Sequence, residues 1–381
     1  MSEGYSRRKF LQTAGTATGA GLILGPAALH AGSMATSAAA LDPTGTPLRT
    51  LAEGKGLLFG CAVIGSDLGD RQFTDTAGQQ FDLVVPIGAL KMDALRPTPD
   101  TFNFVPGDQL LAFAQKRNMK YRGHTLVWFN ALPSWFSSYV TPQNAKQVML
   151  GHINTVVKHY AGNMQSWDVI NEALLASDGR EDGLRKSAWL EMIGPEFIET
   201  AFGAAKDADP NAMLCWNEYG VEKEAPEDEA KRQLWLRHLK DLRARRVPIH
   251  AIGIQSHLDA TSPHFSGPQF DSFLHQISDM GLKIIISELD MTDALPSADI
   301  GQRNQLVASK YEQYLDMVLK HHSVIAVLTW GISDKHTWLN SGFKGARKDG
   351  QPFLPLPFDA GYSAKPQWYA IARALEKAPA R

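Results

Sequence analysis

The sequence predicts a (β/α)8 barrel, a closed ring of eight parallel strands with a helix after each strand. Eight short apolar runs recur at regular spacing and alternate with segments of helical period, as in a parallel sheet built from βαβ units. Polar and aromatic residues stand where these runs end, as they do at the mouth of a barrel. An open doubly wound sheet is less favoured, because no glycine-rich phosphate turn follows the first run.

The N-terminus is typical of an export signal. Arg7 and Arg8 precede an apolar stretch centred on residues 22–24, and several small residues follow as possible cleavage points. This order predicts a twin-arginine signal and therefore a periplasmic or secreted protein. A membrane anchor is the less favoured alternative, because the apolar stretch is short and rich in Gly, Ala and Thr. We assign 1–41 to the signal and a disordered N-terminus, and 42–381 to one domain.

The composition argues against several classes of partner. Lysine and arginine total 38 against 40 acidic residues, a formal charge of −2 over 381 residues, which argues against nucleic acid or anionic lipid as the main partner. No other run approaches membrane length, so we expect a soluble mature chain without a membrane partner. Cys61 and Cys215 lie inside apolar runs and are predicted to be small core residues rather than a disulfide. The sequence leaves the oligomeric state open.

The hydrophobic period gives the elements in order. The predicted strands are residues 57–64, 81–87, 121–129, 166–172, 212–219, 251–257, 283–290 and 324–332. The clearest helical segments are 109–118, 145–160, 196–207, 228–246, 270–280 and 302–321. We expect Val169, Ile254 and Ile285 to fill the inside of the barrel.

Two of the predicted strands end in a glutamate. Glu172 closes the run SWDVINE, and Glu288 closes KIIISE. A strand buried on both faces has no place for an unpaired charge, so packing does not explain these carboxylates. Parallel strands end at one rim of a barrel, which predicts a single site with two carboxylates. A strand-end salt bridge is the alternative for Glu172 alone, and it is less favoured for the pair of glutamates together with Asn171 and His257.

The other strand ends carry amides, histidines and aromatic residues. They are His124, Trp128, Asn217, Tyr219, Gln255, Asp290 and Trp330. Amides bind hydroxyl groups and flat aromatic rings cover the apolar faces of sugars, so the set predicts a carbohydrate site. Trp128 and Trp330 could instead be core aromatics. His124 and His257 lack the spacing of metal ligands, so we expect no metal and no cofactor.

Five stretches together resemble glycoside hydrolase family 10, the retaining β-1,4-xylanases on (β/α)8 barrels. They are GHTLVW (123–128), WDVINEA (167–173), GIQSHL (253–258), ISELD (286–290) and TWGISDKHTW (329–338). The resemblance runs from about Gly56 to the C-terminus and implies one glycoside hydrolase domain over 42–381 that acts on a polysaccharide or oligosaccharide. The alternatives are a retaining β-glycosidase for another or decorated glycan, and a non-catalytic carbohydrate-binding barrel.

The resemblance also implies roles for individual residues. Glu172 would be the acid/base and Glu288 the nucleophile, with His257 and Asp290 beside the nucleophile. A retaining mechanism needs two carboxyls about 5–5.5 Å apart, one protonated and one ionised. Asn171 would bind the 2-hydroxyl of the sugar being cleaved. The remaining implied sugar contacts are Lys91, His124, Gln255, Trp330 and Trp338.

Four positions depart from the family pattern on the side of the sugar chain that keeps its non-reducing end, the glycone side. They are Ile87, Gly88, Phe129 and Ala131, where the family has polar residues. Either Phe129 and Ile87 block this side, or Gly88 and Ala131 open space for a bulkier or decorated glycone. We lean to the second interpretation. The loop over 336–360 is predicted to be a lid over the site rather than an ordinary surface loop, because its aromatic residues stand among glycines and prolines.

Overall fold

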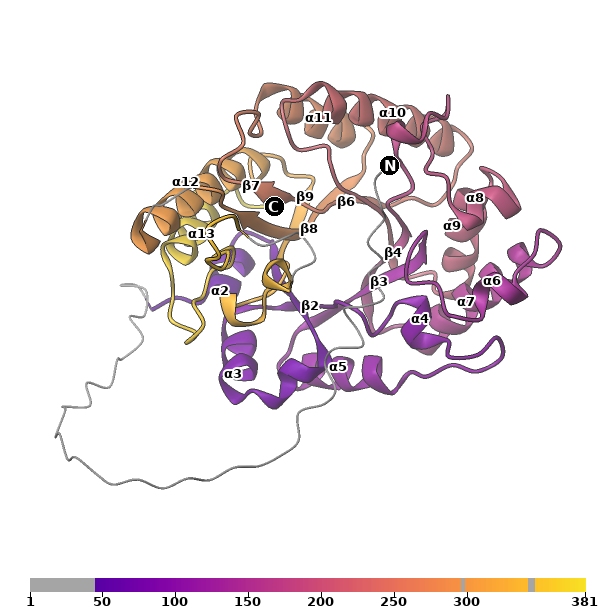
Figure 1. Ribbon diagram of the computed structural model, residues 1–381, viewed down its shortest axis with the longest axis horizontal. Helices are drawn as coiled ribbons and strands as arrows, with labels where there is room; N and C mark the ends of the chain where they lie inside the picture. The colour runs from indigo at the N-terminus through magenta and orange to yellow at the C-terminus, as the bar shows by residue number, and fades with distance from the viewer. Residues whose placement is uncertain (1–44, 296–298, 342–346) are drawn as a thin grey trace.

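The computed structural model describes residues 45–295, 299–341 and 347–381. The predicted export signal lies outside the described residues. Within them, the predicted (β/α)8 barrel is confirmed. The strands run parallel in the order β6-β5-β4-β3-β2-β1-β9-β8, and pairing of β6 with β8 closes the ring. Figure 1 shows this ring of strands with the helices around its outside.

The elements follow the predicted alternation. The strands are β1 (Leu58–Val63), β2 (Leu83–Pro86), β3 (Lys120–Trp128), β4 (Met164–Asn171), β5 (Met213–Glu218), β6 (Ala251–Ile254), β7 (His257–Asp259), β8 (Lys283–Thr292) and β9 (Val324–Thr329). The α-helices are α2 (Leu48–Glu53), α3 (Arg71–Gln80), α4 (Met92–Leu95), α5 (Val105–Lys116), α6 (Phe136–Tyr139), α7 (Ala145–His159), α8 (Ala188–Ile193), α9 (Phe197–Ala208), α10 (Pro226–Ala244), α11 (Pro268–Asp279), α12 (Ile300–Val318) and α13 (Pro366–Lys377).

One predicted strand needs correction. The sixth predicted strand is interrupted, because Ser256 has a left-handed φ of 61° between β6 and β7. Helices α3 and α13 add to the clearest helical segments that the period predicted. Helix α3 buries Phe73, Ala77 and Gln80 along one face. Helix α13 begins at Pro366, a helix-start signal that could have identified it.

One apolar cluster lies inside the ring of strands, and a larger one lies between the strands and the helices. The inner cluster contains Ile285, as expected, together with Ala62, Leu83, Val85, Cys215, Ala251, Ala326, Leu328 and Trp330. The expectation for Val169 and Ile254 is wrong, because both belong to the larger cluster that also contains the helix residues. Successive strand residues point to opposite faces, and Ala251 has already taken the inner position in β6. Cys61 and Cys215 are both buried and free, which confirms them as core residues.

A buried ion pair lies at the β3–β4 boundary below the mouth. Arg122 of β3 contacts the Asp168 carboxylate and donates a hydrogen bond to Ser166 Oγ at 2.6 Å. Both charged side chains are almost completely buried. A buried charge is tolerated only when it is paired, so the opposite charges of Arg122 and Asp168 explain how both fit inside the wall.

Irregularities in β4 and β8 turn their final residues into the mouth. The register of β4 against β5 shifts between Asp168 and Ile170, and that of β8 against β9 shifts between Ile286 and Leu289. Such bulges redirect side chains next to functional sites. They place the ends of both glutamate-bearing strands at the rim. No helix in the described ranges is both long and apolar enough to cross a membrane.

Candidate active site

Glu288 lies at the barrel mouth and is held by two donors. Its Oε1 accepts a hydrogen bond from Asn217 Nδ2 at 2.8 Å, and its Oε2 lies 3.2 Å from His257 Nε2. The side chain is buried, and burial acts to raise its pKa. The hydrogen bond from His257, the nearby His124 and His257 charges and the Asn217 amide outweigh that effect and lower the pKa to about 2. Glu288 is therefore ionised at neutral pH.

His257 bridges two carboxylates. Its Nδ1 lies 2.8 Å from Asp290 Oδ1, while its Nε2 faces Glu288. Both ring nitrogens can donate only in the imidazolium form. Burial acts to lower the pKa of His257, but the charge and hydrogen bond of Asp290 and those of Glu288 raise it to about 9. Trp338 Nε1 donates to the other Asp290 oxygen at 2.5 Å, which fixes the far end of this chain of contacts.

Asn217 connects the two halves of the site. Besides Glu288, its Nδ2 donates to Asn171 Oδ1 at 2.8 Å, and its Oδ1 accepts from Ser287 Oγ at 2.6 Å. Gly253 leaves room for this amide, because a Cβ there would lie 2.2 Å from Asn217 Oδ1. The Nδ2 group of buried Asn171 finds no hydrogen-bond partner within the described part of the chain. A buried unsatisfied donor at a barrel mouth is suited to a ligand hydroxyl.

Glu172 follows β4 directly and is constrained at three points. Its Oε1 accepts from Gln255 Nε2 at 3.0 Å, and its backbone N–H donates to the Asn217 carbonyl at 2.9 Å. Its φ of 57° lies in the left-handed region, an unfavourable conformation for a residue with a side chain. The tethers to the neighbouring strand and loop hold Glu172 in this conformation at the rim.

Arg185 supplies the third tether and was missed by sequence reasoning. Its Nε donates to the Glu172 carbonyl oxygen at 2.6 Å, and its Nη2 donates to the Tyr219 hydroxyl at 2.8 Å. The guanidinium also lies 4.1 Å from the centre of the Phe129 ring, a stacking contact. Arg185 lies in the loop after β4 and not at a strand end, so the strand-end pattern did not select it. Arg185 thereby connects Tyr219 to Glu172. Lys231 Nζ lies 4.2 Å from the centre of the Tyr219 ring.

The remaining aromatic candidates lie around the two carboxylates. His124 Nδ1 is 2.9 Å from Asp168 Oδ2, and its ring meets Trp330 edge-on at 5.5 Å. Trp330 is also 6.2 Å from the His257 ring. It is mostly buried within the inner cluster, so it serves as a core aromatic and still reaches the site. Trp338 is only partly buried, with its ring 5.0 Å from His257.

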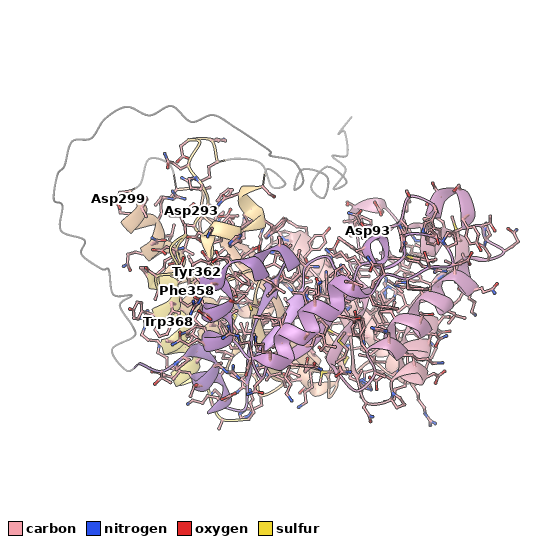
Figure 2. All side chains as sticks on the ribbon, turned by 90° about the horizontal axis from the view of Figure 1, so that it is seen from below. Asp93, Asp293, Asp299, Phe358, Tyr362 and Trp368 are labelled. Atoms are coloured by element: carbon pink, nitrogen blue, oxygen red, sulfur yellow. The ribbon has the colours of Figure 1, made fainter. Side chains whose placement is uncertain are left out.

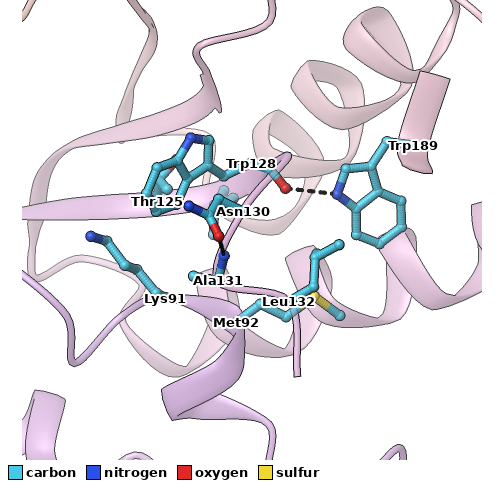
Figure 3. A pocket seen from close by; sticks show the side chains of 9 residues that line it. Lys91, Met92, Thr125, Trp128, Asn130, Ala131, Leu132 and Trp189 are labelled. Carbon is cyan, nitrogen blue, oxygen red and sulfur yellow. Dashed lines mark hydrogen bonds between the residues drawn. The ribbon is translucent and has the colours of Figure 1, made fainter. Parts of the chain in front are cut away.

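Lys91 and Trp128 border a separate small hollow. Figure 3 shows its lining, and its cavity volume of about 10 Å³ is that of roughly one water molecule. Lys91 Nζ lies 4.7 Å above the Trp128 ring, and the Trp128 carbonyl accepts from Trp189 Nε1 at 3.0 Å. Apolar groups dominate the rest of the wall. The other lining residues are Met92, Thr125, Leu126, Asn130, Ala131 and Leu132.

The structure separates the four divergent positions. Only Ala131 lines this hollow. Phe129 packs under Arg185, and Ile87 packs against the inner cluster. A Cβ at Gly88 would meet nothing within 4 Å, so this position is open. The first interpretation, a glycone side blocked by Phe129 and Ile87, is therefore not what these contacts favour.

The loop over 336–360 is only partly the lid expected from its composition. Trp338 reaches Asp290, but Phe358 is 5% exposed and packs in the main core with Tyr362 and Trp368, which are labelled in Figure 2. Phe358 therefore belongs to the core and not to the predicted lid. Arg347 anchors the loop by contacting Asp293. Phe343 lies outside the described residues.

The site residues provide no obvious metal centre. Within 45–295, 299–341 and 347–381, none of them belongs to a group of three or more closely spaced metal-type ligands. Each titratable group at the mouth instead pairs with another protein group, as Glu288 does with His257. The arrangement can hold one ionised carboxylate against a sugar carbon while a second carboxyl, at the end of β4, handles a proton.

Comparison with known proteins agrees with this geometry. A family model described as Glycosyl hydrolase family 10 matches residues 47–374. Endo-1,4-beta-xylanase B of Thermotoga neapolitana is 34% identical over 338 residues, which cover 87% of this chain and 92% of that protein. Beta-1,4-xylanase of Dictyoglomus thermophilum is 31% identical over 326 residues, covering 83% and 87%.

Solved structures give the same result. Xylanase 10B from Thermotoga petrophila RKU-1 in complex with xylobiose has a TM-score of 0.79 at 34% identity, covering 87% of this chain and 98% of that one. The structure described as GH10 from Paenibacillus barcinonensis has a TM-score of 0.76 at 29% identity, covering 86% and 97%. The resemblance inferred from the five motifs is confirmed, and the chain belongs to glycosyl hydrolase family 10.

Proposed function

We propose that this protein hydrolyses β-1,4-xylosidic bonds of xylan or xylooligosaccharides with retention of configuration. The carrying observation is that Glu288 is held ionised by His257 and Asn217 at the same mouth where Gln255 holds Glu172. A double displacement requires one carboxylate as nucleophile and a second carboxyl as proton donor. The names of the relatives, endo-1,4-beta-xylanase and beta-1,4-xylanase, and the xylobiose complex support the choice of sugar.

The reaction proceeds in two steps. Glu288 attacks the anomeric carbon while Glu172 gives its proton to the glycosidic oxygen, so the bond to the leaving sugar breaks and a glycosyl ester forms on Glu288. Glu172, now ionised, takes a proton from a water molecule as that water attacks the same carbon. The ester breaks, Glu288 returns as a carboxylate, and Glu172 is protonated again. Two inversions at one carbon give overall retention.

The surrounding residues serve orientation. Asn217 and His257 fix the two oxygens of Glu288, and Asp290 keeps His257 charged and oriented. The Nδ2 group of Asn171 is available to donate to the 2-hydroxyl of the sugar at the cleavage point, where such a bond strengthens in the transition state. Trp330 and Trp338 flank His257 and provide apolar walls for the ring.

An aryl β-xyloside with a good leaving group tests this proposal. Glu288→Ala should abolish turnover, and added azide should restore it with an inverted product. Glu172→Ala should still form the covalent intermediate from this substrate but release it slowly, because no base activates the water. Turnover that survives Glu288→Ala undiminished would contradict the assignment, and no wild-type turnover would point to a carbohydrate-binding barrel.

A second candidate is a retaining β-glycosidase for a decorated or different β-glycan. It is favoured by the open space at Gly88 and by the small side chain of Ala131. Without polar side chains at these positions an unsubstituted xylose loses roughly 0.5–1.5 kcal/mol of binding for each neutral hydrogen bond that is missing. Initial rates on a panel of linear, arabinose-substituted and glucuronate-substituted xylans and β-glucans separate the two candidates.

We also propose export by the twin-arginine route, on the strength of the Arg7-Arg8 pair and the apolar stretch that follows. Replacing both arginines by lysine should retain the unprocessed chain inside the cell, whereas the unmodified protein should be recovered outside the inner membrane. Equal export of both forms would refute this route.

A further inference from the structure

A cluster of three potential metal ligands lies on the outer layer of the barrel, apart from the catalytic mouth. Asp271 and His275 are one turn apart on α11, and His321 follows α12 just before β9. One ligand atom from each residue lies within 4.8 Å of the other two. It is the one group of this kind in the described parts of the chain. We propose that this cluster binds a divalent transition-metal ion of the Zn²⁺ class.

Both histidines converge on the Asp271 carboxylate. His321 Nε2 is 2.9 Å from Asp271 Oδ1, and His275 Nε2 is 3.9 Å from Asp271 Oδ2. Metal–ligand bonds of about 2.0–2.1 Å in a tetrahedral arrangement place neighbouring ligand atoms about 3.3–3.4 Å apart. His321 faces Oδ1 of Asp271 and His275 faces Oδ2, so the carboxylate lies between the two imidazoles. A bound ion would require the Asp271 carboxyl and the exposed His275 ring to turn toward it.

The chemistry of the donors selects the ion. Two imidazoles and one carboxylate suit zinc and its neighbours, whereas magnesium and calcium prefer oxygen ligands. The His321 side chain is only 3% exposed, while those of Asp271 and His275 are 40% and 67% exposed. The site therefore has one fixed buried ligand and two that ions reach from solvent. Three protein ligands leave a fourth position for water.

The two imidazoles meet edge-on beside the Asp271 carboxylate. The ring centres of His275 and His321 are 4.4 Å apart with an interplanar angle of 66°. An exposed His–Asp ion pair of the kind formed by His159 and Asp108 explains two of the three residues but not the convergence of the third.

A bound ion would join α11 to the segment that leads into β9. That connection ties together two layers of the barrel next to β8, which carries Glu288. An ion that binds the folded chain and not the unfolded one stabilises the fold by mass action. The consequence is a metal-dependent increase in thermal stability without any role for the ion in catalysis.

Calorimetric titration of chelator-treated protein with ZnCl₂ tests the site, with MgCl₂ as the comparison ion. We expect one Zn²⁺ per chain, no comparable Mg²⁺ binding, and a Tm increase of several degrees at saturating Zn²⁺. His275→Ala removes an exposed ligand without disturbing the core and should weaken Zn²⁺ binding at least tenfold. The matched control is His322→Ala, an exposed neighbour outside the cluster, which should bind as the wild type does.

Several results would overturn the proposal. Equal Zn²⁺ affinity in His275→Ala and His322→Ala would show that the ion binds elsewhere. An unchanged Tm in the wild type at Zn²⁺ concentrations that saturate other histidine sites would show that the cluster is an ordinary ion pair. Asp271→Asn provides a second variant, and retention of full Zn²⁺ affinity there would also count against the site.

Discussion

Removing His257 should shift the acid limb of the pH–activity profile to higher pH. His257 is one of the two donors to Glu288, whose pKa of about 2 lies about 2.5 units below its usual value of 4.5. At 1.36 kcal/mol for each unit, the environment favours the ionised carboxylate by about 3 kcal/mol. In His257→Ala, Asn217 still donates to Oε1 of Glu288. Burial, which raises the pKa of Glu288, is then no longer opposed by His257. We expect the pKa that sets the acid limb to increase by at least about one pH unit.

The assay is kcat/KM from pH 2 to 8 on an aryl β-xyloside with a good leaving group. Such a substrate needs little protonation, so its acid limb reports the nucleophile of the free enzyme. At neutral pH we expect a decrease of about 10- to 100-fold, the usual effect of losing an orienting partner. His264→Ala, an exposed histidine, is the control. An acid limb that stays in place in a folded His257→Ala variant would refute the reasoning.

The same pair predicts how stability varies with pH. A lowered pKa at Glu288 adds stability above about pH 4.5, and this is lost as pH falls toward about 2. A raised pKa at His257 adds stability below about pH 6.5, and this is lost as pH rises toward about 9. The contribution of the pair is therefore greatest between about pH 4.5 and 6.5. In urea unfolding at a series of pH values, the free energy of unfolding of His257→Ala should fall less than that of the wild type, both below about pH 4.5 and above about pH 6.5. An unchanged pH dependence of this free energy would contradict the reasoning.

Three further predictions concern the rim. Trp338→Ala should raise KM or lower kcat on xylooligosaccharides while Tm stays within a few degrees; a large Tm loss with unchanged kinetics would make Trp338 a packing residue. Gly253→Ala should lower kcat more than 100-fold on every substrate, because its Cβ would displace the Asn217 amide, and a crystal structure with that amide unmoved would contradict this. The double variant Gly88→Asn, Phe129→His should raise kcat/KM on linear xylooligosaccharides at least about tenfold, roughly 1.4 kcal/mol at the transition state. If the variant gains nothing and the wild type is already highly active on linear xylan, these positions do not set the substrate.

The sequence by itself determined the fold and the location of the site. Apolar runs that alternate with helical segments must bury both faces of a parallel sheet, and polar groups are then tolerated only at its ends. Glu172 and Glu288 could be selected on that basis alone. The four strand-end motifs and the final TWGISDKHTW stretch then identified the family. Each of these signals is local in the chain, so it can be read without coordinates.

Only the tertiary structure decided which groups touch. Arg185 lies in a loop with no strand-end signal, yet it reaches the Glu172 carbonyl, the Tyr219 hydroxyl and the Phe129 ring. Val169 was placed on the wrong face because strand period does not say which alternate set points inward. These outcomes depend on distances between segments far apart in sequence. Bulges, buried hydrogen bonds and the closure of the ring fix such distances, and none of them is written in a local pattern.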